Sequence, residues 1–314
     1  MTRPIEVLRA HTSPYFSSNF NFLEKQELEG LGHVQYVNKF NTNSNKVLIT
    51  NTHVDLNSFI DQDIDLIIHA NSGYDNFTIE QIKALNIPII LGNEIRSEAV
   101  CDYIYNCLTR SISDLKFTTN WDHSRSWNRS LLSDLNITII GYGQIGKILE
   151  KTLSPRVKNI SFYDPYKNLN QIEFNEVVIL ACSLNEKNQE MINKSFLNQM
   201  PKNATLINSA RGKLINWNDL VLHLKNNSNF KAYIDVFPNE PFPIEDFQNI
   251  KNLFMTSHIA GVFNSIGPKT IHFESKILKD FITLDRTEFT NKYSQIDLGQ
   301  EFINDMRISS GNVL

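Results

Sequence analysis

The sequence predicts an α/β fold made of two bodies, each with a parallel sheet covered by helices. Chain length and the alternation of short apolar segments with helical ones both predict this fold. The 314 residues are enough for two domains of roughly 150 residues each. Short β-rich runs bounded by turn residues alternate with segments of helical spacing, and this alternation favours parallel strands joined by crossover helices.

The first body is expected to contain five strands, followed by a helix and an irregular connector. The predicted strands cover residues 5–8, 34–37, 47–50, 65–69 and 87–91, with a helix at 79–84. A second helix is expected over 97–108, because Val100, Ile104 and Leu108 recur on one face. The polar stretch 118–133 is predicted to be an irregular connection between the two bodies.

The second body is expected to form a doubly wound sheet of six strands in series. The predicted strands cover residues 137–140, 160–163, 177–181, 205–208, 231–234 and 253–256. Helices are expected at 145–153, 194–199, 216–224 and 268–284.

Composition and charge exclude several classes of protein. The chain is 41% hydrophobic and 20% charged, and its formal charge is −4, so we expect no nucleic-acid partner. No apolar run approaches the ~18–20 residues of a membrane span, and the N-terminus lacks the apolar core of a signal peptide. The three cysteines form no C-x-x-C pair, which favours reduced thiols in a cytoplasmic protein. No ligand spacing indicates a metal site.

A glycine-rich turn follows the first strand of the second body. The strand at 137–140 leads directly into G-Y-G-Q-I-G (141–146), and a helix follows. Gly141 would permit the tight turn, Gly143 a close approach to a pyrophosphate, and Gly146 close packing of helix and strand. The start of the helix, at Gln144 and Ile145, would offer N–H groups to the phosphates.

Asp164 ends the next predicted strand, eighteen residues after Gly146. A carboxylate there can accept hydrogen bonds from the ribose hydroxyls and would repel a 2′-phosphate, so NAD is the expected cofactor.

Three polar residues lie just beyond the carboxyl ends of later strands, where open α/β sheets bind ligands. Arg211 stands in N-S-A-R-G, Glu240 in D-V-F-P-N-E-P and His258 in S-H-I-A-G. Arg211 suits the carboxylate of a keto acid, and His258 suits proton transfer near neutral pH. Glu240, if bonded to His258, would orient the ring and stabilise its protonated form. The set indicates hydride transfer to or from a 2-hydroxy or 2-keto acid.

Taken in order, these motifs resemble the D-isomer-specific 2-hydroxyacid dehydrogenase family. The resemblance implies a Rossmann domain at 97–285, inserted in a flavodoxin-like substrate domain formed by 1–96 and 286–314. It implies that Arg211 binds substrate, that Glu240 supports His258 and that His258 is the acid/base. It also implies a homodimer.

The resemblance adds further site residues. Asp235 would bond the nicotinamide carboxamide, and Ser183 and Ala210 are additional candidate cofactor contacts. The first body contributes Asn71, Ser72 and Gly73, in N-S-G-Y-D-N, whose backbone amides would take the substrate carboxylate; a plain turn is the alternative.

Departures from the family pattern leave the substrate open. Ala181-Cys182-Ser183 replaces the usual histidine and proline, Ser257 replaces a proline, and Val100-Cys101-Asp102 replaces Val-Ala-Glu. A phosphorylated substrate would need another cation, from Arg96 or from 121–129, which are otherwise surface residues of a linker. The main alternative function is an NAD-sensing binding protein without turnover. A formate-type dehydrogenase would want glutamine rather than Glu240 beside its histidine.

Overall fold

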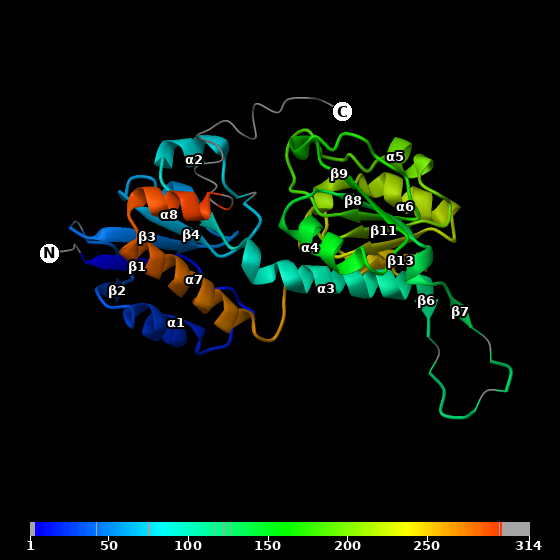
Figure 1. Ribbon diagram of the computed structural model, residues 1–314, viewed down its shortest axis with the longest axis horizontal. Coiled ribbons are helices and arrows are strands. Elements are labelled where there is room, and N and C mark those ends of the chain that lie inside the picture. Colours follow the sequence, from blue (N-terminus) through cyan, green and yellow to red (C-terminus); the bar gives the residue numbers. More distant parts are fainter. Residues whose placement is uncertain are drawn as a thin grey trace. The chain divides into compact units, whose positions relative to one another are not determined.

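The computed structural model describes residues 4–41, 43–74, 76–115, 117–121, 123–125, 127–294 and 296. The chain divides into two compact units, each built around one parallel sheet (Figure 1). The described residues of the first unit lie within 4–96 and 262–296, and those of the second lie within 97–261. Within these ranges, no helix has the length and apolar character that crossing a bilayer demands.

The first unit has a five-stranded parallel sheet in the order β2-β1-β3-β4-β5, which is the flavodoxin-like order. The five predicted strands are confirmed within two residues at either end. The strands are β1 (Ile5–Arg9), β2 (Val34–Tyr36), β3 (Asn45–Thr50), β4 (Leu66–His69) and β5 (Ile89–Leu91). The helices are α1 (Phe20–Glu29), α2 (Ile79–Leu85), α7 (Ile266–Thr283) and α8 (Arg286–Tyr293), with the short η1 (Leu56–Ser58).

Side chains that alternate along the strands separate two cores in this unit. Val47 and Ile49 of β3 pack in one core with Phe273 and Ile277 of α7, whereas Leu48 packs in the other with Ile82 of α2. Successive strand residues point to opposite faces, so a continuous apolar run is what a sheet covered on both sides requires.

The chain returns from the second unit to the first at residue 262, and not at residue 286 as predicted. The sequence assigned residues 262–285 to the cofactor domain, but the structure places α7 in the first unit. The reason is the burial of Phe273, Ile277 and Leu278 against the β1–β3–β4 core. An apolar helix face shows that a helix is buried, but not which of two sheets it covers. Of the predicted C-terminal segment, residues 297–314 lie outside the described residues.

The second unit has a six-stranded parallel sheet in the order β13-β12-β11-β10-β8-β9. Its strands, all predicted, are β8 (Asn136–Ile140), β9 (Asn159–Tyr163), β10 (Val177–Leu180), β11 (Thr205–Asn208), β12 (Lys231–Ile234) and β13 (Leu253–Met255). Its helices are α3 (Asn93–Ile112, of which 97–112 belong to this unit), α4 (Gln144–Leu153), α5 (Lys194–Gln199) and α6 (Trp217–Asn226). Strand order reverses between β8 and β10, and open α/β sheets bind ligands beyond the carboxyl ends at such a switch point.

A two-stranded hairpin extends from the end of α3 (Figure 1). It pairs β6 (Ser113–Asp114) with β7 (Asn128–Arg129) in antiparallel register, where an irregular connector was predicted. Three aromatic side chains on this arm are strongly exposed: Phe117 at 94%, Trp121 at 71% and Trp127 at 80%. Exposed aromatic side chains of this size are candidates for contact with a partner.

Candidate active site

The glycine turn joins β8 to α4 with no room for side chains at two of its glycines. Gly141 has φ 107°, and a Cβ there would lie 2.6 Å from the backbone of Ala181. A Cβ on Gly146 would lie 2.4 Å from the carbonyl oxygen of Gly141. Gly143 precedes the first residue of α4, and a Cβ there would project into open space. The turn therefore leaves a clear approach to the N-terminus of α4, which suits a pyrophosphate.

Asp164 is fixed beside this turn. Its Oδ2 accepts a hydrogen bond from the backbone N–H of Tyr142 at 2.8 Å. Its Oδ1 accepts one from the N–H of Tyr166 at 3.1 Å. Each carboxylate oxygen has a second lone pair, so the half-buried Asp164 can still accept hydrogen bonds from a ribose.

His258 and Glu240 form the central pair of the second unit. Nδ1 of His258 lies 2.7 Å from Oε2 of Glu240, and both side chains are partly exposed. The other oxygen of Glu240 accepts from the N–H of Phe237 at 2.9 Å. His258 has φ 54°, an unusual backbone conformation for a residue with a side chain.

The charge state of Glu240 reflects these contacts. Burial raises the pKa of the Glu240 carboxyl, but hydrogen bonds from His258 and Phe237 and the positive charges of His258 and Arg211 outweigh it. The net pKa lies below the usual value. Glu240 is therefore an anion at neutral pH, as a partner for a protonated imidazole must be.

Arg211 is held next to this pair by the loop after β11. The side chain of Asn208 accepts from the N–H of Ala210 at 3.0 Å and donates to the carbonyl of Arg211 at 2.9 Å. Gly212 follows, and a Cβ there would lie 1.9 Å from the carbonyl carbon of Phe237. The loops that carry Arg211 and Glu240 are thus in direct backbone contact.

Asp235 lies inside the unit and organises the His258 loop. Its carboxylate is fully buried and accepts from the hydroxyl of Thr256 at 2.6 Å and from the N–H groups of Ile259 and Ala260 at 2.8 Å each. Its backbone carbonyl accepts from the N–H of His258 at 2.8 Å. These bonds give Asp235 a positioning role that the sequence did not indicate.

Other supporting residues were also missed at the level of sequence. Asn208 and Gly212 begin and end the N-S-A-R-G motif, so their place in that motif was an available signal. Tyr103 of α3 shares a hydrogen bond of 2.7 Å with Thr256, and no local pattern marks it. Of the predicted cofactor contacts, Ser183 is exposed in the loop after β10 and Ala210 is half-buried after β11.

The Asn71–Gly73 turn belongs to the first unit and follows β4. The carbonyl of Asn71 accepts from the N–H of Gly92 at 3.0 Å. The carbonyl of Gly73 faces Nε2 of the buried His69 at 2.8 Å. Among the described residues, the N–H groups of Ser72 and Gly73 make no hydrogen bond. Asp75, the fifth residue of N-S-G-Y-D-N, lies outside the described residues.

The three cysteines and Arg96 are held by packing contacts and do not belong to the candidate site. Burial raises the pKa of Cys101 and Cys182 to about 12 and that of Cys107 to about 11, so all three are thiols at neutral pH. Cys182 packs against the core of its unit. Arg96 stacks over the ring of Tyr15 in the first unit. Within the described residues, no group of three His, Cys, Asp or Glu side chains could hold a metal ion.

Comparison with known proteins identifies relatives of the chain. Residues 108–260 match the family described as D-isomer specific 2-hydroxyacid dehydrogenase, NAD binding domain. A glyoxylate reductase of Thermococcus kodakarensis is 25% identical over 214 residues, which cover 60% of this chain and 64% of that protein. The match thus spans less than two thirds of that relative's length. An erythronate-4-phosphate dehydrogenase of Wigglesworthia glossinidia brevipalpis is 26% identical over 321 residues, covering 90% of this chain and 80% of that protein.

Solved structures share the fold. An NAD+-bound 3-phosphoglycerate dehydrogenase of Entamoeba histolytica aligns with a TM-score of 0.69 at 17% identity, covering 92% of this chain and 98% of that one. A D-lactate dehydrogenase of Aquifex aeolicus with NAD and lactic acid aligns with a TM-score of 0.66 at 18% identity, with the same coverage.

The parallel sheets, the glycine turn and the matched domain define a protein of two α/β units, the second of which matches an NAD-binding domain. Residues 108–260 match the D-isomer specific 2-hydroxyacid dehydrogenase family, and the chain is a distant relative of the proteins above.

Proposed function

We propose that this chain is an NAD-dependent oxidoreductase that interconverts a small 2-keto acid and the corresponding D-2-hydroxy acid. The observation that carries the proposal is the 2.7 Å hydrogen bond between His258 and Glu240, with Arg211 close enough to lower the pKa of Glu240. The D configuration rests on the family match of residues 108–260.

The residues of the second unit then have distinct roles. When bound, the nicotinamide supplies or accepts the hydride. His258, bonded through Nδ1, has Nε2 left to donate a proton to the carbonyl oxygen as negative charge develops there. Glu240 stabilises the protonated His258 ring, which is the form that donates this proton. Arg211 binds the substrate carboxylate and polarises the carbonyl, since a guanidinium forms strong, directional hydrogen bonds with both.

In the first unit, we propose that the amides of Ser72 and Gly73 bind the substrate carboxylate. In a trans peptide the C=O and N–H groups point in opposite directions. Gly92 holds the carbonyl of Asn71, so the N–H of Ser72 faces the other way. His69 holds the carbonyl of Gly73 and fixes the far side of the turn.

We propose NAD rather than NADP on the basis of Asp164. Its carboxylate lies at the end of β9, bonded to the glycine turn, and would repel a 2′-phosphate. Gly141, Gly143, Gln144, Ile145 and Gly146 would hold the pyrophosphate. Ser183 and Ala210 follow β10 and β11 and would contact the cofactor. For Asp235 we propose support of the nicotinamide site through the loop that it holds, since its own carboxylate is buried.

A turnover assay distinguishes this enzymatic function from that of an NAD-sensing protein, which binds the cofactor without catalysis. NADH oxidation would be followed with glyoxylate, hydroxypyruvate and pyruvate, for the wild type and for His258→Gln. We expect turnover that the substitution lowers by about 10²–10⁴-fold while NADH binding is retained. NADH binding without turnover on a broad panel of keto acids would instead favour the sensor.

We also propose that the protein is a homodimer. The exposed aromatic side chains of the β6–β7 arm support this, because burying them against a second copy would remove a large apolar area from water. Light scattering after size exclusion gives the mass directly. A Trp121→Ser/Trp127→Ser double variant should shift the protein toward the monomer, and a wild type that is already monomeric would refute the proposal.

A further inference from the structure

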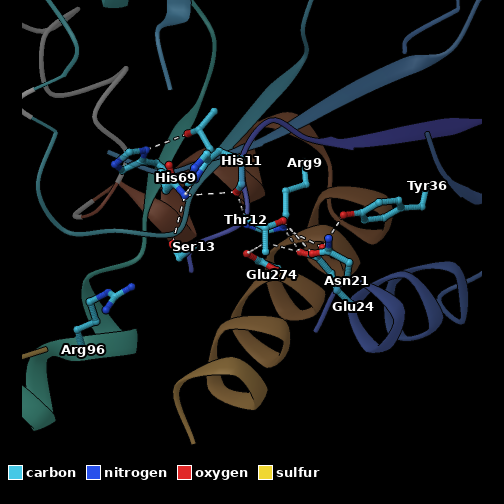
Figure 2. Close-up of polar contacts among 12 residues, drawn as sticks. Arg9, His11, Thr12, Ser13, Asn21, Glu24, Tyr36, His69, Arg96 and Glu274 are labelled. Carbon is cyan, nitrogen blue, oxygen red and sulfur yellow. Dashed lines mark hydrogen bonds and ion pairs between the residues drawn. The ribbon is translucent and has the colours of Figure 1, made fainter. Parts of the chain in front are cut away.

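The carboxyl edge of the first unit's sheet carries a polar cluster that the proposed roles do not use (Figure 2). His11 and Ser13 follow β1, and Asn51 and His53 follow β3. Asn51 is buried, at 2% exposed, and its side-chain amide joins the two loops. It donates to Nδ1 of His11 at 2.8 Å and to the hydroxyl of Ser13 at 3.3 Å, while its oxygen accepts from the N–H of His53 at 3.0 Å.

This arrangement fixes the tautomer of His11. The amide nitrogen of Asn51 can only donate, so Nδ1 of His11 must accept, and the ring proton is carried by Nε2. Burial, the neighbouring His53 and Arg9 lower the pKa of His11, which agrees with a neutral ring. The His53 ring lies 5.1 Å from that of His11, centroid to centroid. Within the described residues, Nε2 of His11 makes no hydrogen bond, and the atom is accessible rather than buried.

The sheet places this donor near the proposed carboxylate site. β1, β3 and β4 are adjacent strands in register, and neighbouring strands lie ~4.8 Å apart. The end of β1, two residues before His11, is therefore about 10 Å from the end of β4, three residues before Ser72. Loops that leave strands this close can contact the same small substrate, with its carboxylate at Ser72 and Gly73 and its far end toward His11.

We propose that His11 is a specificity-determining residue, whose Nε2–H donates to a hydroxyl or phosphate oxygen on C3 or C4 of a short 2-keto acid. This inference rests on the proposed function. An oxygen-bearing substituent satisfies the donor, whereas an apolar one would cover it and leave it unpaired, which disfavours binding. Asn51 acts as a positioning residue, because it sets which ring nitrogen carries the proton.

Two matched substrate pairs test the proposal: hydroxypyruvate against pyruvate, and 2-keto-4-hydroxybutyrate against 2-ketobutyrate. The wild type should show a higher kcat/KM for the hydroxylated member of at least one pair. His11→Leu should lower that preference on the order of tenfold, because the hydroxylated acid loses a hydrogen bond and the unsubstituted acid no longer covers an unpaired donor. His11→Gln keeps a donor and should retain most of the preference. His272→Leu, an exposed histidine of α7, is the matched control, and thermal midpoints monitor folding.

The outcomes separate this inference from the proposed function. Turnover with no preference in either pair by the wild type overturns the role of His11, even if His11→Leu does not fold. A preference that His11→Leu leaves intact does the same. No turnover of any keto acid removes the proposed function, and this inference with it.

Discussion

The Nδ1 atom of His258 lies 2.7 Å from Oε2 of Glu240, which leaves Nε2 as the ring nitrogen that we propose faces a substrate. The two residues are eighteen positions apart and come from loops after different strands, β12 and β13. Asp235 holds the His258 loop, and the N–H of Phe237 holds Glu240. The pair is therefore fixed from both sides, as the proton transfer proposed for it would require.

Glu240→Gln should move the pH dependence of keto-acid reduction. The Glu240 anion favours the protonated form of His258, and reduction needs that proton. Glu240→Gln removes the negative charge that would stabilise an imidazolium at this position, so the pH profile of kcat/KM should differ from that of the wild type. Glu245→Gln, an exposed glutamate nearby, is the control. A variant profile that superimposes on the wild type would contradict the pairing.

The same contacts make a prediction for stability. The pKa of Glu240 is lowered in the folded state, so its ionised form stabilises the fold above the pKa of an ordinary carboxyl. That contribution should vanish as the pH falls through the lowered value. Urea denaturation from pH 7 to acid should therefore show a steeper loss in the wild type than in Glu240→Gln.

Arg211→Ala should lower kcat/KM for keto acids by about 10²-fold, since a charge-assisted bond to the substrate is lost. Most of the effect should lie in KM, with a smaller fall in kcat if the guanidinium also polarises the carbonyl. Arg211→Lys should recover only part, because lysine cannot bind two oxygens in a planar fork. Lys213→Ala, two residues away and exposed, should have no such effect; equal losses in both variants would point to damage to the loop.

Asp164→Asn should relax the preference for NADH over NADPH. Asparagine can still accept from the N–H of Tyr142, but it no longer repels a 2′-phosphate. The ratio of kcat/KM values for the two cofactors should fall on the order of tenfold. Asp164→Ala should relax the ratio as well and also weaken both cofactors, because the glycine turn loses its anchor. An unchanged ratio in both variants would remove Asp164 from cofactor selection.

The buried charge network of the first unit should dominate that unit's stability. Arg9 contacts Glu24 and Glu274, and Tyr36 donates to Glu24 at 2.6 Å (Figure 2). Arg9→Met would leave the buried Glu24 anion without its positively charged partner and should lower the free energy of unfolding by about 3–5 kcal/mol. Glu274→Gln preserves an acceptor for Arg9 and should cost about 1 kcal/mol or less. Chemical denaturation measures both, and equal losses would contradict this account.

The pH dependence of this network has the opposite sign to that of Glu240. Burial raises the pKa of Glu274 well above the usual value, although Arg9 opposes the rise. Folding therefore holds a proton on Glu274, and stability should decline as the pH rises from the ordinary value toward the raised one. Glu274→Gln should lack this decline, while Glu24, whose pKa is lowered, still titrates in both proteins.

Most strands could be predicted because their signal is local. Val177–Leu180 and its neighbours are continuous apolar runs, as strands buried on both faces must be. The helix α1 was missed because the buried face of Phe20, Glu24 and Leu28 includes an acid. Glu24 can be buried only because Arg9, fifteen residues away, pairs with it, and no local pattern contains that information.

The site shows the same division between local and distant information. Arg211, Glu240 and His258 follow strands, and parallel topology brings such positions to one edge of a sheet. The burial of Asp235 and the contact of Tyr103 with Thr256 depend on packing between distant segments. Their roles needed the structure.

The first unit draws its core from both ends of the chain: Val7 and Ile49 pack with Phe273 and Ile277. A gene segment that encoded only the first 96 residues would therefore carry half of a hydrophobic interior. If that segment were replaced by the matching segment of a related protein, strands from one protein would have to pack against α7 from another. Chimeras designed to transfer substrate preference should thus exchange residues 4–96 together with 262–296, leaving the intervening residues, and the groups proposed for chemistry, untouched.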